Sequence, residues 1–522
     1  MNRSLLPIII AAAMFLSLFR LGTPKLFDVD EAVFSEATRE MVVSNDWITP
    51  TYNGVNRYDK PILFYWLMAA SYRVFGINEF GARFPSALAA ILMIYFIFLL
   101  TKRFSGWEAA HYAALSGALS VYYLVYSRAA VTDMTLTLTI SLSLFSFYMT
   151  TAEGTARSPV YLYGFYLFSA LAFLTKGLIG IIFPFGIAIV YSAVTGGLRS
   201  IRRVFSLKGI LLFTAVAAPW YLAEVIINGR EFIEQFFVKH HFRRFTDVIS
   251  GHKGPIYYYL IVIVVGLFPW ISFLPAGISS ALKKKDPLHL FALIWLVLVF
   301  LFFSLSTTKL PNYMLPALPP ALVLIGVGMS ERNEKWRRYS FASMGMLSLA
   351  IAIALIFVSR KYLPKIGVAD AGWPLVAASA AFLGGALCLY CAFSRRNLYY
   401  PIAVFMIFFF SALVMGGLPA ASDYLQGTLY KYSVYAKERL RQDEKIIVFG
   451  INNPSIAFYS ERRLIGANTK EELTSLAGKY VHAVAISRTK DAGPLLDSGY
   501  TLVTSDSRYA LFETKQDRLK EQ

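Results

Sequence analysis

Acidic and basic residues of the kinds that catalyse reactions of phosphorylated substrates lie near the start of this 522-residue chain. Asp30 and Glu31 stand together in one hydrophilic stretch, and Asp59 and Lys60 follow in the same stretch. A carboxylate can take a proton as a general base, and a lysine can stabilise a phosphate anion. A further acid, Asp133, directly precedes a long uncharged run, and an acid at the edge of a membrane span is often functional.

A second basic stretch, Lys239 to Phe245, contains two histidines and two arginines. We interpret the acids and cations of these separate stretches as converging on one cavity at a membrane surface, which suits a reaction on an anionic lipid. The alternative is that Asp30 only caps a helix and that Lys60 is an ordinary cation at the membrane interface.

The composition predicts that a membrane positions these residues. Hydrophobic residues make up 57% of the chain and charged residues 16%, and the mean hydropathy is +0.53. Soluble domains contain about 25% charged residues. The net charge of +18 is expected to set membrane topology, and we predict no nucleic-acid partner. The only cysteines, Cys388 and Cys391, lie in an apolar run, which excludes a disulfide-rich scaffold.

Uncharged runs predict about thirteen transmembrane helices, most of them near the length that crosses a bilayer. The runs are 5–19, 84–101, 109–127, 134–152, 158–175, 177–198, 209–223, 254–282, 287–308, 310–330, 339–359, 371–394 and 397–422. With a cytoplasmic N-terminus, seventeen Lys and Arg residues fall in cytoplasmic segments and six in the short opposite loops. The positive-inside rule favours this orientation. We interpret the first run as an uncleaved anchor.

The predicted fold is a polytopic α-helical membrane protein with a small C-terminal α/β domain. Residues 1–422 form the transmembrane domain, and the outer loops 20–83 and 224–253 form the active site. Residues 423–522 form an extracytoplasmic domain, with strands expected at 446–449, 482–487 and 508–513 and helices at 427–442 and 470–479.

Two helices are expected to lie along the membrane surface in the first outer loop. Phe34, Ala37 and Met41 share one face of a helix that begins near Asp30, and acids occupy another face. Residues 61–72 are apolar but too short to span a bilayer, so they are expected to form a second interfacial helix.

The order of these fragments resembles the aminoarabinose transferase and protein mannosyltransferase group of C-class glycosyltransferases. The fragments that carry the resemblance are Asp30-Glu31, Glu36, Arg39-Glu40-Met41, Asp46-Trp47, Asn53-Gly54, Asp59-Lys60-Pro61, Tyr65-Trp66, Phe80, Ala82-Arg83, Pro85-Ser86, His241, Arg244-Phe245, Pro255, Tyr258-Tyr259, Pro269-Trp270, Phe303-Ser304, Lys309-Leu310-Pro311, Tyr313 and 316–319. The chain departs from the aminoarabinose type at Val33 and Phe34, where that type often has Arg-Tyr, and at Asp59 and His240.

The resemblance implies an inverting transfer of a sugar from a polyprenyl-phosphate donor, of the undecaprenyl-phosphate type, to an extracytoplasmic acceptor. Lipid A of lipopolysaccharide is the expected acceptor. In this interpretation Asp30, Glu31 and Asp133 are the catalytic carboxylates. The donor phosphate would be bound by Lys60, Arg244, Lys309 and Tyr313, and the acceptor or sugar by Tyr58, Asp59, Arg128 and His241.

Several alternatives remain open at this point. The acceptor could instead be a protein, as in protein O-mannosyltransferases, or another envelope glycan. A transporter or flippase of lipid-linked sugars is the non-enzyme alternative, but it predicts ionisable residues deep within the spans. No cofactor is certain, and a divalent metal near Asp59 and His241 is a further hypothesis. The expected location is the inner membrane, with the C-terminal domain in the periplasm.

Overall fold

The computed structural model describes residues 5–152, 158–236, 254–364, 372–480 and 482–514. The chain divides into two compact units. The helical unit consists of Met1–Leu21, Tyr58–Leu67 and Arg83–Gly417, and the sheet unit consists of Gly22–Arg57, Met68–Ala82 and Leu418–Gln522. Much of the first outer loop therefore folds with the C-terminal tail, although hundreds of residues separate them in the sequence.

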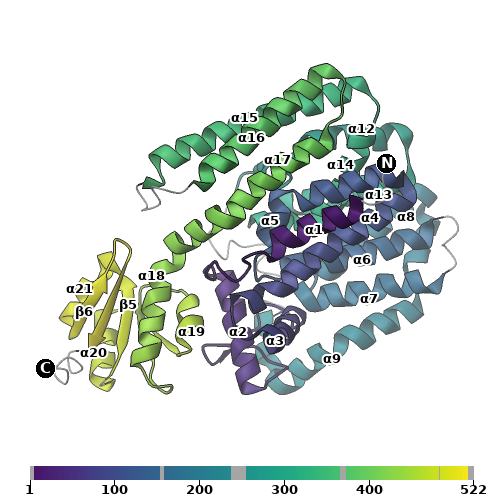
Figure 1. Ribbon diagram of the computed structural model, residues 1–522. Coiled ribbons are helices and arrows are strands. Elements are labelled where there is room, and N and C mark those ends of the chain that lie inside the picture. The colour runs from purple at the N-terminus through teal and green to yellow at the C-terminus, as the bar shows by residue number, and fades with distance from the viewer. Residues whose placement is uncertain (1–4, 153–157, 237–253, 365–371, 481, 515–522) are drawn as a thin grey trace. The chain divides into compact units, whose positions relative to one another are not determined.

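The helical unit contains almost only helices, most of whose longer members are labelled in Figure 1. They are α1 (Leu5–Leu18), α4 (Glu79–Ala118), α5 (Val121–Ser127), α6 (Asp133–Thr151), α7 (Pro159–Lys176), α8 (Ile179–Gly196), η1 (Leu198–Val204), α9 (Leu207–Phe232), α11 (Tyr258–Gly266), η3 (Trp270–Phe273), α12 (Leu274–Lys284), α13 (Pro287–Leu305), η4 (Pro311–Ala317), α14 (Leu318–Ser330), α15 (Glu334–Lys361), α16 (Trp373–Ser394), α17 (Tyr399–Ala412) and η6 (Leu413–Gly417). Helix α3 (Leu63–Phe75) and the first residues of α4 contribute to both units.

Among the described residues, nine helices are long and apolar enough to cross a membrane, and the bent pair Tyr258–Gly266 and Trp270–Lys284 is a tenth candidate. The sequence predicted about thirteen. The numbers differ because α4 contains one predicted run and most of the next, joined around a break at Gly106, whose φ of 86° is unfavourable for other residues. In addition, Leu5–Leu18 is shorter, and α7 is made less apolar by three tyrosines and a terminal lysine.

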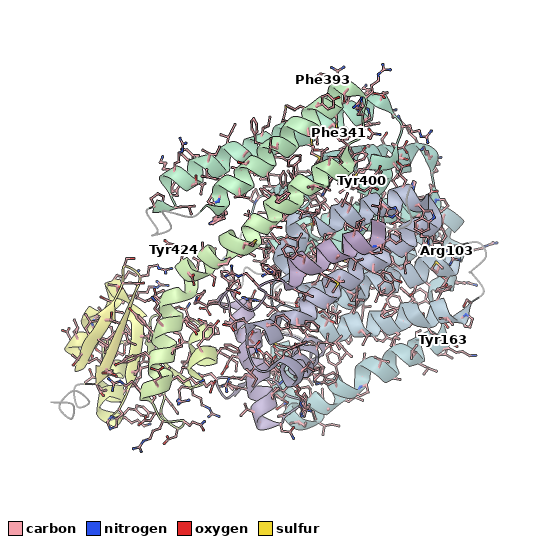
Figure 2. All side chains as sticks on the ribbon, viewed as in Figure 1. Arg103, Tyr163, Phe341, Phe393, Tyr400 and Tyr424 are labelled. Carbon is pink, nitrogen blue, oxygen red and sulfur yellow. The ribbon has the colours of Figure 1, made fainter. Side chains whose placement is uncertain are left out.

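Many helices of the helical unit pack against helices that are close to them in the sequence. Helix α6 contacts α7, α7 contacts α8 and α9, and α15 lies along α16 (Figure 1). Small residues permit close approach, as membrane helices require. A Cβ at Gly277 of α12, for example, would lie 1.9 Å from the Leu324 carbonyl oxygen of α14. Aromatic rings fill other contacts, and Phe341 of α15, labelled in Figure 2, stacks on Tyr399 with ring centroids 5.1 Å apart.

The sheet unit is built around a mixed five-stranded sheet with the strand order β4-β3-β5-β7-β6. Its strands are β3 (Ile446–Phe449), β4 (Leu464–Ala467), β5 (Val484–Arg488), β6 (Tyr500–Ser505) and β7 (Tyr509–Thr514). Strand β3 runs parallel to β4 and β5, whereas β7 is antiparallel to β5 and β6. The three predicted strands overlap β3, β5 and β7, and strands β4 and β6 were not predicted.

Helices cover both faces of this sheet (Figure 1). Ile446 and Val448 pack with α18 (Leu418–Arg439) and α19 (Ser455–Ser460), whereas Ile447 and Phe449 pack with α20 (Lys470–Lys479) and α21 (Gly493–Asp497). This alternation follows from the two-residue period of a strand. A short 3-10 helix, η7 (Thr489–Asp491), precedes α21. The predicted fold class, helical membrane domain with a small C-terminal α/β domain, is confirmed.

The first outer segment of the sheet unit consists of a helix and a hairpin. Helix α2 (Asp30–Ser44) begins where the sequence predicted a helix, and β1 (Thr51–Tyr52) pairs with β2 (Val55–Asn56). Asn53 and Gly54 form the turn of this hairpin with φ values of 57° and 73°. Such left-handed backbone favours asparagine and glycine at these positions.

Candidate active site

Asp30 is the first residue of α2, and its side chain is exposed. The cap position belongs to Val29, and no side chain caps the helix, so the alternative in which Asp30 only caps the helix is wrong by one residue. The Asp30 carboxylate makes no hydrogen bond or ion pair with any residue in the described part of the chain. An exposed carboxylate at a helix N-terminus, free of partners, is chemically available to accept a proton.

Two other acids of α2, Glu31 and Glu36, are buried, whereas the sequence predicted an amphipathic helix with its acids on a polar face. Glu31 is 5% exposed, and its Oε2 accepts a hydrogen bond from Phe27 N at 2.9 Å. Glu36 is 1% exposed and accepts two hydrogen bonds of 2.7 Å from the Arg39 guanidinium. Burial raises the pKa of Glu36 to about 7, and the two Arg39 hydrogen bonds oppose this shift.

Glu40 connects the end of α2 to the hairpin. Its carboxylate accepts hydrogen bonds from Thr51 Oγ1 at 2.6 Å, from Asn53 N at 2.6 Å and from Gly54 N at 3.1 Å. The Asn53 side chain in turn exchanges two hydrogen bonds with the backbone of Leu464 in β4, at 2.7 and 2.8 Å. The hairpin is therefore attached to an edge strand of the C-terminal sheet.

Asp28 was not singled out by the sequence, yet its carboxylate is surrounded by donors. Ser455 N donates to Oδ1 at 2.9 Å, and Ser455 Oγ and Asn453 Nδ2 donate to Oδ2 at 2.6 and 2.9 Å. The Gln426 amide, oriented so that both of its ends are satisfied, donates to Oδ2 at 3.0 Å and accepts from Asp28 N at 3.1 Å. Burial raises the pKa of Asp28 above the usual carboxyl value, and these hydrogen bonds oppose the shift.

In the helical unit, Asp133 forms a buried ion pair. It is the first residue of α6, is 4% exposed, and its Oδ1 lies 2.5 Å from Lys176 Nζ at the end of α7. Asn312 Nδ2 of η4 donates to the same oxygen at 3.1 Å. Lys176 Nζ also lies 5.5 Å from the centre of the Tyr313 ring. Asp133 and Tyr313 are thus brought together by two residues that the sequence did not select.

Two predicted ligands, Arg128 and Lys309, bind backbone carbonyls at helix ends. The Arg128 guanidinium donates to the carbonyls of Leu16, Ser17, Phe19 and Arg20 at distances of 2.9 to 3.1 Å. Lys309 Nζ donates to Ser304 O and Ser306 O, each at 2.9 Å, and to Phe303 O at 3.4 Å. These contacts satisfy the unpaired carbonyls at the ends of α1 and α13. A role for either residue in ligand binding stays a prediction.

The remaining predicted residues are only partly described. Tyr58 is buried, and its ring meets that of Phe232 edge-on at 5.6 Å between centroids. Asp59 and Lys60 are half-buried, and Lys60 Nζ donates to Asp59 O at 3.1 Å. His241 and Arg244 lie outside the described residues. Within the described ranges no group of His, Cys, Asp and Glu could hold a metal ion, so the metal hypothesis gains no support there.

Comparisons with known proteins place this fold in a family. Residues 59–222 match the family model described as dolichyl-phosphate-mannose-protein mannosyltransferase. Over 381 residues the chain is 30% identical to the undecaprenyl phosphate-α-4-amino-4-deoxy-L-arabinose arabinosyl transferase of Aeromonas salmonicida, which covers 69% of this chain and 67% of that one. The chain belongs to the aminoarabinose transferase and protein mannosyltransferase group of C-class glycosyltransferases.

Other members of this glycosyltransferase group agree with that placement. The arabinosyl transferase 1 of Pseudomonas fluorescens is 31% identical over 369 residues, 69% of this chain and 66% of that relative. The chain thus spans about two thirds of the length of such relatives. The solved structure of ArnT from Cupriavidus metallidurans bound to undecaprenyl phosphate is 22% identical, with a TM-score of 0.81 over 98% of each chain, which shows a shared fold. The family and the multi-pass membrane architecture expected from the sequence are confirmed.

Lys176, Asn312 and Asp28 were not predicted from the sequence. Lys176 could have been noticed because it ends an apolar run on the side where the positive-inside rule expects few basic residues. Asn312 stands between Pro311 and Tyr313, within a fragment that already carried the family resemblance. Asp28 gave no separate signal, since its partners lie about 400 residues further along the chain.

Proposed function

We propose that the protein transfers a sugar from undecaprenyl phosphate to lipid A on the outer face of the inner membrane, with 4-amino-4-deoxy-L-arabinose as the sugar. The observation that carries this proposal is the similarity to the Aeromonas salmonicida arabinosyl transferase, whose name states both the sugar and the lipid carrier. Helices long and apolar enough to cross a membrane would place the protein in the lipid phase in which a polyprenyl donor dissolves.

In this reaction an acceptor oxygen attacks the anomeric carbon of the sugar, and the bond from that carbon to the donor phosphate breaks. Undecaprenyl phosphate leaves with the bonding electrons. Asp30 takes the proton of a hydroxyl acceptor, or orients an acceptor that is already an anion. Its exposure and lack of partners among the described residues suit this role. A general base of this kind contributes roughly 10²–10⁴-fold to the rate.

Cations stabilise the negative charge that develops on the leaving phosphate. Lys60 and Arg244 are the candidates from the sequence, and Lys176 is added because its ammonium is fixed by the Asp133 carboxylate and lies beside the Tyr313 ring. Asp133 then orients the cation rather than acting on a proton, since its Oδ1 is already shared between Lys176 and Asn312. Glu31 holds the backbone before α2 through Phe27 N.

A protein O-mannosyltransferase is the second candidate, because residues 59–222 match the mannosyltransferase family model. In both cases the N-terminus lies in the cytoplasm and the C-terminal domain in the periplasm, an orientation that the distribution of basic residues supports. The two candidates differ in the acceptor and in the sugar, whereas a polyprenyl phosphate is the leaving group in both.

The test is to incubate purified protein with undecaprenyl-phosphate aminoarabinose, lipid A and a mixture of envelope proteins, and to measure the acceptor masses. We expect a mass gain of one aminoarabinose on lipid A and none on protein. Modified protein obtained with a mannose donor would favour the second candidate. Donor that crosses vesicle membranes without releasing undecaprenyl phosphate would overturn both and indicate a flippase.

A further inference from the structure

The C-terminal tail holds the outer segment that contains Asp30, and it does so on both sides of α2. Before the helix, Lys25 N donates to Ser422 Oγ and Leu26 N donates to Tyr459 OH, each at 2.7 Å. After the helix, Asn53 is bonded to the backbone of β4 as described above. All these residues belong to the sheet unit. The tail therefore determines where the chain enters and leaves α2.

Asp28 is the attachment nearest to Asp30. The groups that contact its carboxylate are all donors: the Ser455 amide and hydroxyl, the Asn453 amide and the Gln426 amide. Such a set suits an acceptor-only group, which an ionised carboxylate is. With both oxygens occupied, Asp28 has little capacity left for a substrate proton. Its contacts are therefore suited to fixing the backbone.

The position of Asp30 depends on that backbone. The Asp30 carboxylate has no polar partner in the described part of the chain, and no side chain caps α2. The first turn of the helix holds it, where Ala32 N donates to Phe27 O at 3.2 Å and Val33 N donates to Val29 O at 3.0 Å. Asp28 lies inside this turn. A displacement of about 1 Å in a reacting group can reduce a rate about 10²-fold.

We propose that Asp28 is a positioning residue for Asp30, and that the C-terminal domain serves the reaction by holding the start of α2 through Asp28. This inference rests on the proposed function, in which Asp30 is the base. The C-terminal domain would then affect the rate of turnover and not the binding of the donor, because other residues bind the donor phosphate. It also accounts for the half-buried Asp28 carboxylate, two residues from the base, being bonded in the described part of the chain by neutral donors.

Two variants test this role from opposite sides of the contact. Asp28→Ala removes the carboxylate, and Asn453→Ala removes one donor from the tail without changing the outer segment. We expect kcat to fall about 10–100-fold in Asp28→Ala and less in Asn453→Ala, with the KM for the donor within about twofold of wild type. Asp28→Asn keeps the shape and one acceptor, so it should recover part of the rate.

Asp506→Ala is the matched control. Asp506 is also a hydrogen-bonded carboxylate of the tail: it accepts from Arg508 N and Tyr509 N, each at 2.7 Å, and from the Thr428 hydroxyl. None of these contacts involves the outer segment. Its loss should therefore lower the melting temperature of the tail without changing kcat by more than about twofold.

Amide hydrogen exchange supplies a readout that needs no turnover. In the full chain, Asp28→Ala and Asn453→Ala should accelerate exchange at Ala32 and Val33, and Asp506→Ala should not. Unchanged exchange at these two amides would overturn the proposal, as would an equal loss of kcat in Asp506→Ala. Faster exchange with an unchanged kcat would also overturn it. A wild-type protein with no transfer activity would instead refute the proposed function, and exchange would still decide whether Asp28 holds the start of α2.

Discussion

Asp30 and Asp133 each begin a helix, in the sheet unit and the helical unit respectively, but their surroundings differ. Both lie where the helix dipole favours negative charge. Asp133 is 4% exposed and its charge is balanced by Lys176, whereas Asp30 is exposed and has no partner among the described residues. A paired, buried carboxylate contributes to the structure and orients its cation. An unpaired, exposed one costs little stability to change and remains available for proton transfer.

The variant Asp30→Asn tests this difference between Asp30 and Asp133 with the largest expected effect. Because Asp30 contributes no described polar contact, we expect the unfolding temperature to be unchanged while kcat falls by roughly 10²–10⁴-fold. The measurements are undecaprenyl phosphate released per unit time and thermal unfolding of the same preparation. Wild-type turnover in Asp30→Asn would remove this residue from the mechanism.

Asp133→Ala should differ from Asp30→Asn by a large loss of stability. It leaves the Lys176 ammonium without its carboxylate in a largely buried place, and breaking such a pair costs about 3–5 kcal/mol. The double variant Asp133→Ala with Lys176→Met should recover part of this loss, because neither charge then remains unpaired. Denaturation in detergent measures both. Equal stability of the single and double variants would show that the pair is not coupled.

Arg128→Lys tests whether Arg128, which the sequence predicted to bind a ligand, instead contributes to stability. A lysine cannot reproduce the forked guanidinium that reaches four carbonyls, so we expect a loss of about 1.5–3 kcal/mol with the donor KM unchanged. A raised KM with intact stability would instead favour the predicted contact with sugar or acceptor.

Glu36 provides a smaller, pH-dependent effect within α2. Its pKa is raised from the ordinary 4.5 to about 7 in the folded protein, so the folded state binds more protons than the unfolded state between these values. Stability from this group is therefore present below pH 4.5 and decreases as the pH rises towards 7, by at most about 1.4 kcal/mol per pH unit. Glu36→Gln cannot titrate and should lack this slope, although it also weakens the contact with Arg39. Parallel stability curves from pH 5 to 8 would contradict the raised pKa.

The parts of the fold that depend on local composition could be predicted from the sequence. Uncharged runs mark the helices, and short continuous apolar runs mark β3 and β5, which are buried on both faces of the sheet. The sequence predicted two separate spans where the structure has the single element α4 with a break at Gly106. Charged residues separate the two uncharged runs, among them the exposed Arg103 (Figure 2). The predicted number of membrane spans therefore differs from the structure, although most helices lie where the uncharged runs predicted them.

Within the candidate site, the sequence indicates single residues but not the residues that contact them. Asp30 was selected from its residue type and its place in the sequence, and its catalytic role stays a prediction. The partners of Asp133 come from α7 and η4, and those of Asp28 come from α18 and from the start of α19 and the residues before it. Such pairings depend on tertiary contacts that no spacing rule encodes. For the same reason the sequence did not indicate that Arg128 and Lys309 donate to the carbonyls of helix ends, and their predicted roles in ligand binding stay predictions.

The most direct measurement is the stoichiometry of donor use by the wild-type protein in a single turnover. Purified protein in excess over undecaprenyl-phosphate aminoarabinose, with lipid A present, should release one undecaprenyl phosphate for each sugar that appears on lipid A. Release should cease when lipid A is omitted. Donor that remains intact, or sugar that appears on lipid A without equal release of undecaprenyl phosphate, would contradict the proposed transfer.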